Sequence, residues 1–134
     1  MTLGVRAWVE RDDGCVALVR HTYTPGLYFP GGGVERGEPA AEALRREMHE
    51  EIGAVIFAPP ILLGVFSNHP VFPNDHVLFY RVPPETWEQQ VATSDGEIAE
   101  VLWVKPESPP GETTPATARR FLEFVEGRAP SPFW

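Results

Sequence analysis

The chain has 134 residues, of which 43% are hydrophobic and 22% charged, and its formal net charge at pH 7 is −8. This length suits a single domain over residues 1–134, and the hydrophobic fraction is too high for a disordered segment. An acidic chain without a Lys/Arg run argues against nucleic acid polymers and anionic membranes as partners. The single cysteine excludes an intramolecular disulfide, and no apolar run reaches membrane-spanning length. These features predict a cytoplasmic protein.

The first half of the chain alternates short strands with turns. Strands are expected over 3–9, 15–21 and 27–29, and Arg11-Asp12-Asp13-Gly14 predicts a hairpin turn between the first two, because Asp and Gly tolerate positive φ. Pro30 and three glycines stop the third strand. Residues 38 to about 52 then predict a helix, with Gly53 as its C-cap.

The second half predicts further strands and a final helix. Residues 54–66 are apolar but interrupted by Pro59-Pro60, which favours an edge strand or a bent one. The order of strands, glycine loop, helix, strands and helix predicts an α/β/α sandwich with a mixed β-sheet between helices. The remaining expected segments are a loop at 67–75, strands at 76–82 and 97–104, one helical turn around Trp87, a Pro-rich connector at 106–115 and a helix over about 116–126. The tail is expected to be loosely held, although Phe133 and Trp134 could dock on the body.

Three carboxylates cluster on the first predicted helix. At about 100° per residue, Glu47, Glu50 and Glu51 fall at one edge of an apolar stripe that faces the core. The stripe consists of Ala41, Leu44, Met48 and Ile52. The carboxylates could be ordinary surface charges, a view that suits Glu50 taken alone.

A metal ion explains the other two carboxylates better. A glutamate pointing at the core edge is desolvated unless something compensates, and like charges within one turn repel. A bound divalent cation relieves both costs, because Mg²⁺ prefers hard oxygen ligands. The glycines at 31–33 either form a plain flexible turn or let the backbone approach a ligand closely, with a carbonyl available to the cation.

The same stretch resembles the Nudix family. The Nudix box has the form G-x5-E-x7-R-E-U-x-E-E-x-G-U, in which U is a bulky aliphatic residue, and residues 32–54 of this chain match every fixed position. These positions are Gly32, Glu38, Arg46, Glu47, Glu50, Glu51 and Gly53. The one departure is Ala54, which is smaller than the usual aliphatic residue, although Val55 beside it can fill the same space.

The resemblance implies a Nudix-like fold and hydrolysis of the pyrophosphate bond in a nucleoside diphosphate linked to another group, such as an NTP, ADP-ribose or an NDP-sugar. It implies that Glu47, Glu50 and Glu51 are ligands of Mg²⁺ (or Mn²⁺), completed by the main-chain carbonyl of Gly31. It also implies that Glu38 and Arg46 are structural and tie the loop to the helix.

The general base is less clearly indicated. The candidates are Glu97 and Glu100, with Glu47 as an alternative on the helix. Glu97 is favoured because it follows Asp95-Gly96 at an expected junction between loop and strand. The alternative is that both Glu97 and Glu100 are exposed strand charges.

Substrate contacts are weakly indicated. Arg6 and Arg20 could reach a phosphate, Tyr28 could stack on a base, and Pro70 lies near the spacing of a proline found in ADP-ribose-cleaving relatives. The expected partner is a small nucleotide-like molecule, and the Pro-rich connector and aromatic tail are plausible homodimer contacts. Two other hypotheses stay open: a catalytically silent nucleotide sensor on a Nudix scaffold, and an unrelated acidic protein with a Ca²⁺-binding or interaction helix.

Overall fold

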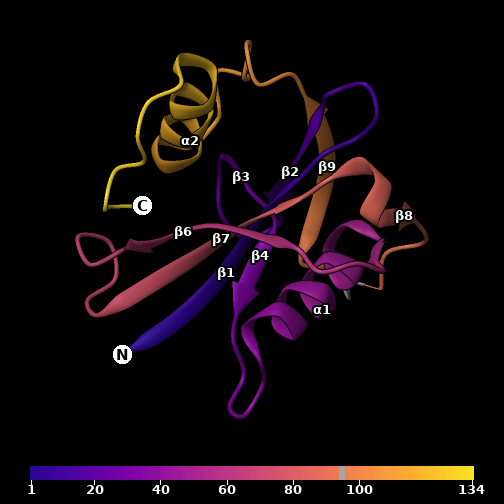
Figure 1. Ribbon diagram of the computed structural model, residues 1–134, viewed down its shortest axis with the longest axis horizontal. Helices are drawn as coiled ribbons and strands as arrows, with labels where there is room; N and C mark the ends of the chain where they lie inside the picture. The colour runs from indigo at the N-terminus through magenta and orange to yellow at the C-terminus, as the bar shows by residue number, and fades with distance from the viewer. Residues whose placement is uncertain (94–95) are drawn as a thin grey trace.

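Two helices and nine strands make up the part of the chain that the structure describes. The computed structural model describes residues 1–93 and 96–134 (Figure 1). The elements in chain order are β1 (Thr2–Val9), β2 (Val16–His21), β3 (Leu27–Tyr28), β4 (Gly31–Gly33), α1 (Ala40–Ile52), β5 (Ala54–Ile56), β6 (Ile61–Ser67), β7 (Asp75–Val82), the 3-10 turn η1 (Pro84–Thr86), β8 (Trp87–Gln89), β9 (Ile98–Val104) and α2 (Pro115–Glu126).

The central strands bury side chains on both of their faces. On β1, Val5, Ala7 and Val9 belong to the core that contains the buried face of α1, whereas Trp8 belongs to the core that contains Phe121 of α2. Because successive side chains of a strand point to opposite faces, one strand serves two cores. α1 and α2 therefore cover opposite faces, and the predicted α/β/α sandwich is confirmed.

Backbone hydrogen bonds divide most of the strands between two larger sheets. One is the predicted mixed sheet, in the order β4-β1-β7-β6 with β1 and β7 parallel, and the other is antiparallel, in the order β3-β2-β9. The turn predicted between β1 and β2 is present, since the Arg11 N–H donates to the Cys15 carbonyl at 2.9 Å. Beyond the bridge between Glu10 and Val16, however, the two strands enter different sheets. The hairpin is therefore limited to its turn.

The glycine run forms a strand where the sequence predicts a loop. β4 pairs antiparallel with β1, with Gly31 opposite Arg6. A Cβ on Gly31 would collide with the Val5 carbonyl oxygen, and a Cβ on Gly32 would lie 2.5 Å from Oε1 of Glu47. Residue 31 must therefore be glycine, because a side chain there would meet fixed backbone, whereas at residue 32 only the end of the Glu47 side chain would have to shift. These residues therefore bring β4 against β1 and against a carboxylate of α1.

The buried face of α1 is centred closer to the carboxylates than predicted. The helix begins at Ala40 and ends at Gly53, whose left-handed conformation (φ 69°) caps it. Ala43, which is not part of the predicted stripe, is fully buried, whereas Ala41 of that stripe is only half-buried. Ala43 lies about 100° from Leu44 on the side of the glutamates, so this face is rotated toward them. Glu51, which the helix geometry places almost in line with Leu44, is part of this buried face.

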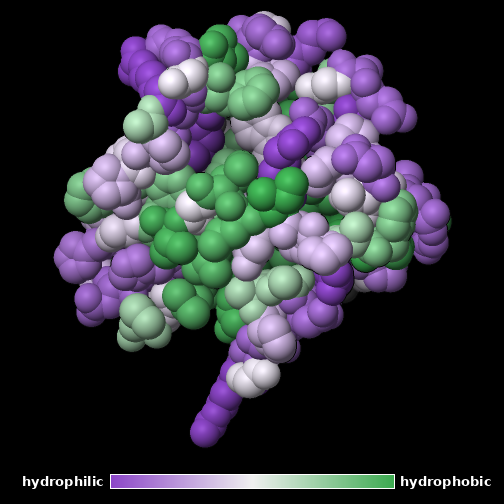
Figure 2. All heavy atoms as spheres, viewed as in Figure 1, coloured by the Kyte–Doolittle hydropathy of each residue, from purple (hydrophilic) through white to green (hydrophobic). Residues whose placement is uncertain are grey.

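The segment after α1 confirms the predicted break at Pro59-Pro60. The prolines separate β5 from β6, which lie in different sheets, and β6 is an edge strand. Hydrophobic residues gather over the middle of the view in Figure 2, where Figure 1 shows β6. The exposed apolar side chains of this strand are those of Ile61, Leu62, Leu63 and Val65.

The C-terminal residues dock on the body, which is the second of the two alternatives for the tail. Phe133 forms a parallel bridge with Ser67 at the end of β6, and the ring of Trp134 packs 5.3 Å from that of Phe79. Burial of this large aromatic surface explains why the tail is held. Neither helix in residues 1–93 or 96–134 is long and apolar enough to cross a membrane.

Candidate active site

Glu51 is a carboxylate buried in the core of the fold. Its side chain projects from α1 beneath β4 and is only 7% exposed, and the Gly31 N–H donates a hydrogen bond to its Oε1 at 2.9 Å. Burial raises the pKa of Glu51 to about 7, although this hydrogen bond and the charge of Arg6 act in the opposite direction. The ionised side chain therefore lacks enough positive charge in its surroundings, which is the situation that a bound cation relieves.

Arg46 joins the helix to the loop that precedes it. Its guanidinium donates to both oxygens of Glu38 at 2.9 Å and to the Gly33 carbonyl at 3.1 Å. The hydrogen bonds from Arg46 and from the Glu35 N–H lower the pKa of Glu38 to about 2. This paired geometry holds β4 and the following loop against α1.

Glu47 and Glu50 share the same arginine. Nη1 of Arg46 donates to Glu47 at 2.9 Å and lies 3.7 Å from a carboxylate oxygen of Glu50. Burial raises the pKa of Glu47, and Arg46 partly offsets this effect. Among the described residues no three acidic, histidine or cysteine side chains form a ready-made metal cluster. The three carboxylates nevertheless fit a hard divalent cation, because they offer oxygen donors around an acid that lacks a counter-charge.

Arg6 and Glu97 act electrostatically on this cluster. Arg6 donates from Nη1 to the Phe29 carbonyl at 2.9 Å, and its positive charge lowers the pKa of Glu51. The negative charge of Glu97 has the opposite effect on the same pKa. The main-chain carbonyl of Glu97 accepts a hydrogen bond from the Thr22 N–H at 3.0 Å, which fixes the start of β9 against the end of β2.

Arg20 and Glu100, two of the predicted site residues, form ion pairs away from the carboxylates of α1. Arg20 donates to Glu100 at 3.1 Å and to Glu112 at 2.7 Å, so its guanidinium lies between two carboxylates. Glu100, the other candidate base, is thereby held in an ion pair on the sheet surface. Pro70 lies exposed in the turn between β6 and β7. Glu97 and Glu100 are both exposed, as the alternative expected, and they differ in that Glu97 acts on the pKa of Glu51 whereas Glu100 is paired with Arg20.

An aromatic group around His21 was not predicted from the sequence. The ring of Tyr28 lies 5.2 Å from that of His21, and the exposed ring of Tyr23 lies 5.0 Å from it. His21 is buried, and within the described ranges its Nδ1 has no hydrogen-bond partner. Burial and the charge of Arg6 lower the pKa of His21. Its apolar neighbours in β2 are the only sequence signal of this burial.

The chain matches the NUDIX domain family over residues 1–124. It belongs to the Nudix family. Nucleoside triphosphatase NudI from Salmonella arizonae and that from Salmonella paratyphi B are each 36% identical to this Nudix protein over 63 residues. The match covers 43% of this chain and 45% of each relative, so the chain spans less than half the length of these curated relatives.

Solved structures show the same fold. A MutT NUDIX hydrolase from Burkholderia pseudomallei has a TM-score of 0.75 and 25% identity, covering 92% of this chain and 97% of the other. A MutT protein from Methanosarcina mazei Go1 has a TM-score of 0.72 and 24% identity, covering 94% of this chain and 93% of the other. The predicted Nudix-like fold is therefore confirmed. Proteins of this family generally require a divalent metal ion.

Proposed function

We propose that this Nudix protein is a metal-dependent hydrolase of the pyrophosphate bond in a nucleoside diphosphate linked to another group. The observation that carries the proposal is the buried Glu51, whose pKa is affected by the charge of Glu47, inside a complete Nudix box. Within this class we favour nucleoside triphosphates, because the NudI relatives are nucleoside triphosphatases. ADP-ribose and NDP-sugars are the other members of the class that the sequence predicts.

Glu47, Glu50 and Glu51, with the Gly31 carbonyl, would hold Mg²⁺ or Mn²⁺. The bound metal would neutralise phosphate oxygens and lower the pKa of a coordinated water. Support comes from the hard oxygen donors and from the raised pKa of Glu51, which shows that the apo site disfavours the ionised carboxylate. Glu47 and Glu50 would exchange part of their contact with Arg46 for the cation.

The other residues of the site position the substrate and move a proton. Arg6 would contact a phosphate oxygen, and Glu97 would accept the proton of the attacking water. The water oxygen forms a bond to phosphorus while the bridging P–O bond breaks, and the leaving phosphate carries away the electron pair. Arg46 contributes by holding β4 against α1 through Glu38. The cytoplasmic location and the homodimer remain predictions from the sequence.

The experiment is a turnover panel in Mg²⁺ with ribo- and deoxynucleoside triphosphates, ADP-ribose and NDP-sugars. Wild type, Glu51→Gln and Glu42→Gln are compared, because Glu42 is an exposed glutamate of the same helix that pairs with Arg45. We expect turnover of at least one nucleotide, a loss of about 10³-fold in Glu51→Gln and less than about 2-fold change in Glu42→Gln.

Two results would contradict the proposal. If folded wild-type protein turns over no member of the panel but binds nucleotides tightly, the protein is a nucleotide sensor on a Nudix scaffold. If Glu51→Gln retains full turnover, the box carboxylates do not form the catalytic centre.

A further inference from the structure

The outer edge of β6 is open over most of its length. β6 is the last strand of the sheet β4-β1-β7-β6, and β7 pairs with one of its two edges. Within residues 1–93 and 96–134 the other edge is bridged only at Ser67, whose N–H donates to the Pro132 carbonyl at 2.8 Å and whose carbonyl accepts from the Trp134 N–H at 2.9 Å. A strand edge with unpaired backbone groups is a template for a further strand.

The pairing of β6 with β7 shows which backbone groups face this open edge. In an antiparallel pair every second residue turns its N–H and C=O away from the partner strand, as Ser67 does. The β6 residues of this kind lie opposite every second residue of β7 and are Ser67, Val65 and Leu62. The irregularity between Leu62 and Gly64 shifts the count along β6 by one residue but keeps the alternation along β7. Val65 and Leu62 therefore present backbone donors and acceptors to the outside.

The side chains of these two residues are apolar and exposed. Leu62 is 50% exposed and Val65 is 55% exposed. They lie opposite Tyr80 and Leu78, which contribute to the core beneath α1, but α1 itself packs on β1, β4 and β5. The helix therefore covers the other end of the sheet and leaves an apolar strip along β6.

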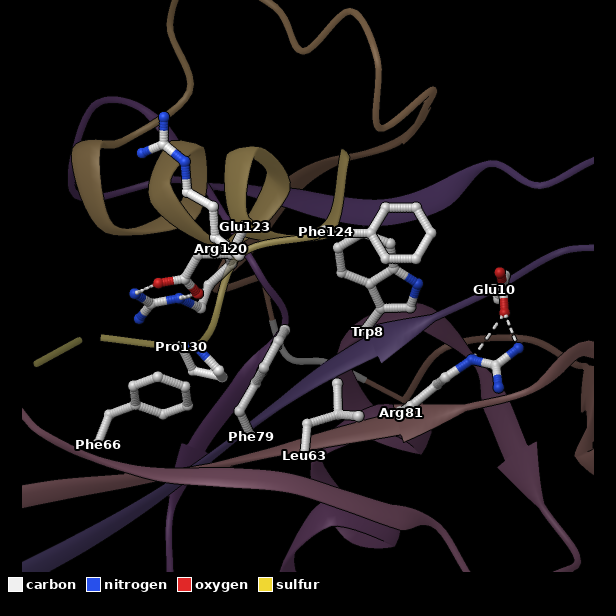
Figure 3. A pocket seen from close by; sticks show the side chains of 11 residues that line it. Trp8, Glu10, Leu63, Phe66, Phe79, Arg81, Arg120, Glu123, Phe124 and Pro130 are labelled. Carbon is white, nitrogen blue, oxygen red and sulfur yellow. Dashed lines mark hydrogen bonds and ion pairs between the residues drawn. The ribbon is translucent and has the colours of Figure 1, made fainter. Parts of the chain in front are cut away.

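The other face of β6 is turned toward α2. Leu63 comes from β6 and points into a pocket of about 490 Å³ whose walls include Trp8 and Phe124 (Figure 3). This face therefore has α2 as its neighbour within the same chain. The uncovered part of β6 is its outer edge, together with the face that carries Leu62 and Val65.

The sequence of β6 does little to keep this edge from pairing. Charged side chains, prolines and bulges are the usual means of protecting an edge strand. Ile61–Ser67 contains neither a charged residue nor a proline, and only the irregularity near Gly64 is present. Copies of a chain with a net charge of −8 repel each other over most of their surface, but this edge is neutral. It is therefore a place where two copies can meet without that repulsion.

The open edge is complementary to itself. Two antiparallel copies of β6 related by a two-fold axis place Val65 of each copy opposite Leu62 of the other, and both residues share one face and turn their backbone groups outward. In the same register Ser67 falls opposite Pro60 of the second copy. The C-terminal segment already occupies the edge at Ser67, and Pro60 has no N–H to donate. The pairing therefore ends at the same point in both copies.

The size of this contact is that of a weak dimer. The stretch from Pro60 to Ser67 is about 26 Å long at about 3.3 Å per residue, and a sheet layer is about 10 Å thick. With the side chains of both faces, such a contact covers on the order of 500 Å² per copy, at the lower limit of specific interfaces. Phe133, which is 51% exposed and bridged to Ser67, lies at the end of this surface and extends it. The expected dimer dissociates at micromolar concentrations.

We propose that two copies of this chain associate through their β6 edges and join their four-stranded sheets into one continuous sheet across a two-fold axis. Leu62 and Val65 of the two copies form the apolar centre of the interface. The sequence suggested the Pro-rich connector and the aromatic tail as dimer contacts, whereas this interface lies on β6 with Phe133 of the tail beside it. It uses none of the box residues, so it does not depend on the proposed hydrolysis.

Sedimentation equilibrium of the wild-type protein from about 1 to about 500 µM measures the association. We expect a reversible monomer–dimer equilibrium with a Kd of about 10–100 µM. Val65→Lys places a charge at the centre of the interface and should weaken the dimer by about 10-fold or more, because the charge would be desolvated. Val125→Lys is the matched control, since Val125 is a 48% exposed valine of α2, and it should change the Kd by less than about 2-fold.

A cross-linking variant tests the register and keeps the proposal testable if Val65→Lys fails to fold. In the double variant Leu62→Cys/Val65→Cys, each new thiol lies opposite the other kind in the second copy, with Cα atoms about 5.5 Å apart, which a disulfide spans. Mild oxidation should therefore give a covalent dimer. Leu62→Cys alone should give little, because it faces Val65 of the second copy. The native Cys15 is buried and does not compete.

Three results would overturn the proposal. A monomer at every concentration would show that the β6 edge is only an uncovered surface. A dimer whose Kd is the same in wild type and in folded Val65→Lys would place the interface elsewhere on the molecule. Equal cross-linking of Leu62→Cys and of the double variant would exclude the two-fold register. Turnover of the substrate panel is a separate readout, so the proposed hydrolysis and this interface can fail independently.

Discussion

The two faces of the sandwich differ in how their functional groups are brought together. On the α1 face, Glu38, Arg46, Glu47 and Glu51 come from one continuous stretch of sequence and meet β4 from the same stretch. On the α2 face, the aromatic residues Trp8, Phe66, Phe79, Phe124 and Trp134 come from distant segments. The charged face thus depends on local spacing, whereas the aromatic face depends on the tertiary fold.

The largest expected effect separates the two candidate bases near the charged face. Glu97→Gln should lower kcat by about 10³-fold, equivalent to about 4 kcal/mol, because proton transfer from the attacking water is lost. Glu100→Gln should change kcat by less than about 3-fold, since Glu100 is held in a surface ion pair by Arg20. The measurement is kcat and kcat/KM for both variants, each compared with wild type. Equal effects of the two substitutions would remove Glu97 from the mechanism.

The next effect concerns the stability of the charged face without metal. The pKa of Glu51 is about 7 in the folded protein against 4.5 for the ordinary side chain, so between these pH values the folded state holds more protons than the unfolded state. The free energy of unfolding in EDTA should therefore fall by about 3 kcal/mol as the pH rises from 4.5 to 7. Glu51→Gln should remove this contribution.

Urea unfolding in EDTA at pH 5 and pH 8 measures the difference. Burial also raises the pKa of Glu47, which adds a slope of the same sign in both proteins. The comparison is therefore between wild type and Glu51→Gln, with Glu42→Gln as the control on the same helix. Identical pH dependence in wild type and Glu51→Gln would show that Glu51 is not the desolvated acid. Addition of Mg²⁺ at pH 8 should restore stability in wild type, because ligand binding favours the folded state.

The contrast between the two faces also explains which features of the structure could be predicted from the sequence. The spacing of the box places its carboxylates on one side of a helix, and the helix end at Gly53 follows from local backbone preference. Local spacing does not specify how far the buried face turns, so Ala43 was missed, whereas the desolvation of Glu51 followed from its position on the helix. The glycine strand was missed for a similar reason, because its pairing partner β1 lies far away in the sequence.

Long-range contacts account for most of the remaining differences. The parallel pairing of β1 with β7 joins segments separated by about seventy residues, and no local pattern encodes it. The same holds for the pairing of Arg20 with Glu112. The side chain that was predicted to contact a phosphate binds a carboxylate of the protein instead. The pocket beside Trp8 exists only because α2 returns over the first sheet, so its residues show no shared sequence motif.

The smallest effect tests whether the aromatic face is independent of the charged one. Trp134→Ala removes ring contacts with Phe66 at 5.4 Å and Phe79 at 5.3 Å, and should lower the free energy of unfolding by about 1–2 kcal/mol. Phe133→Ala, at a residue that is 51% exposed, should lower the free energy of unfolding by less than about 0.5 kcal/mol.

Thermal unfolding and kcat are measured for both variants. Because the carboxylates lie on the opposite face, kcat at a temperature where both variants are folded should stay within about 2-fold of wild type. A parallel fall in stability and kcat in Trp134→Ala alone would show instead that the tail on the aromatic face helps to hold β4, through Phe29 and Pro30, against the carboxylates.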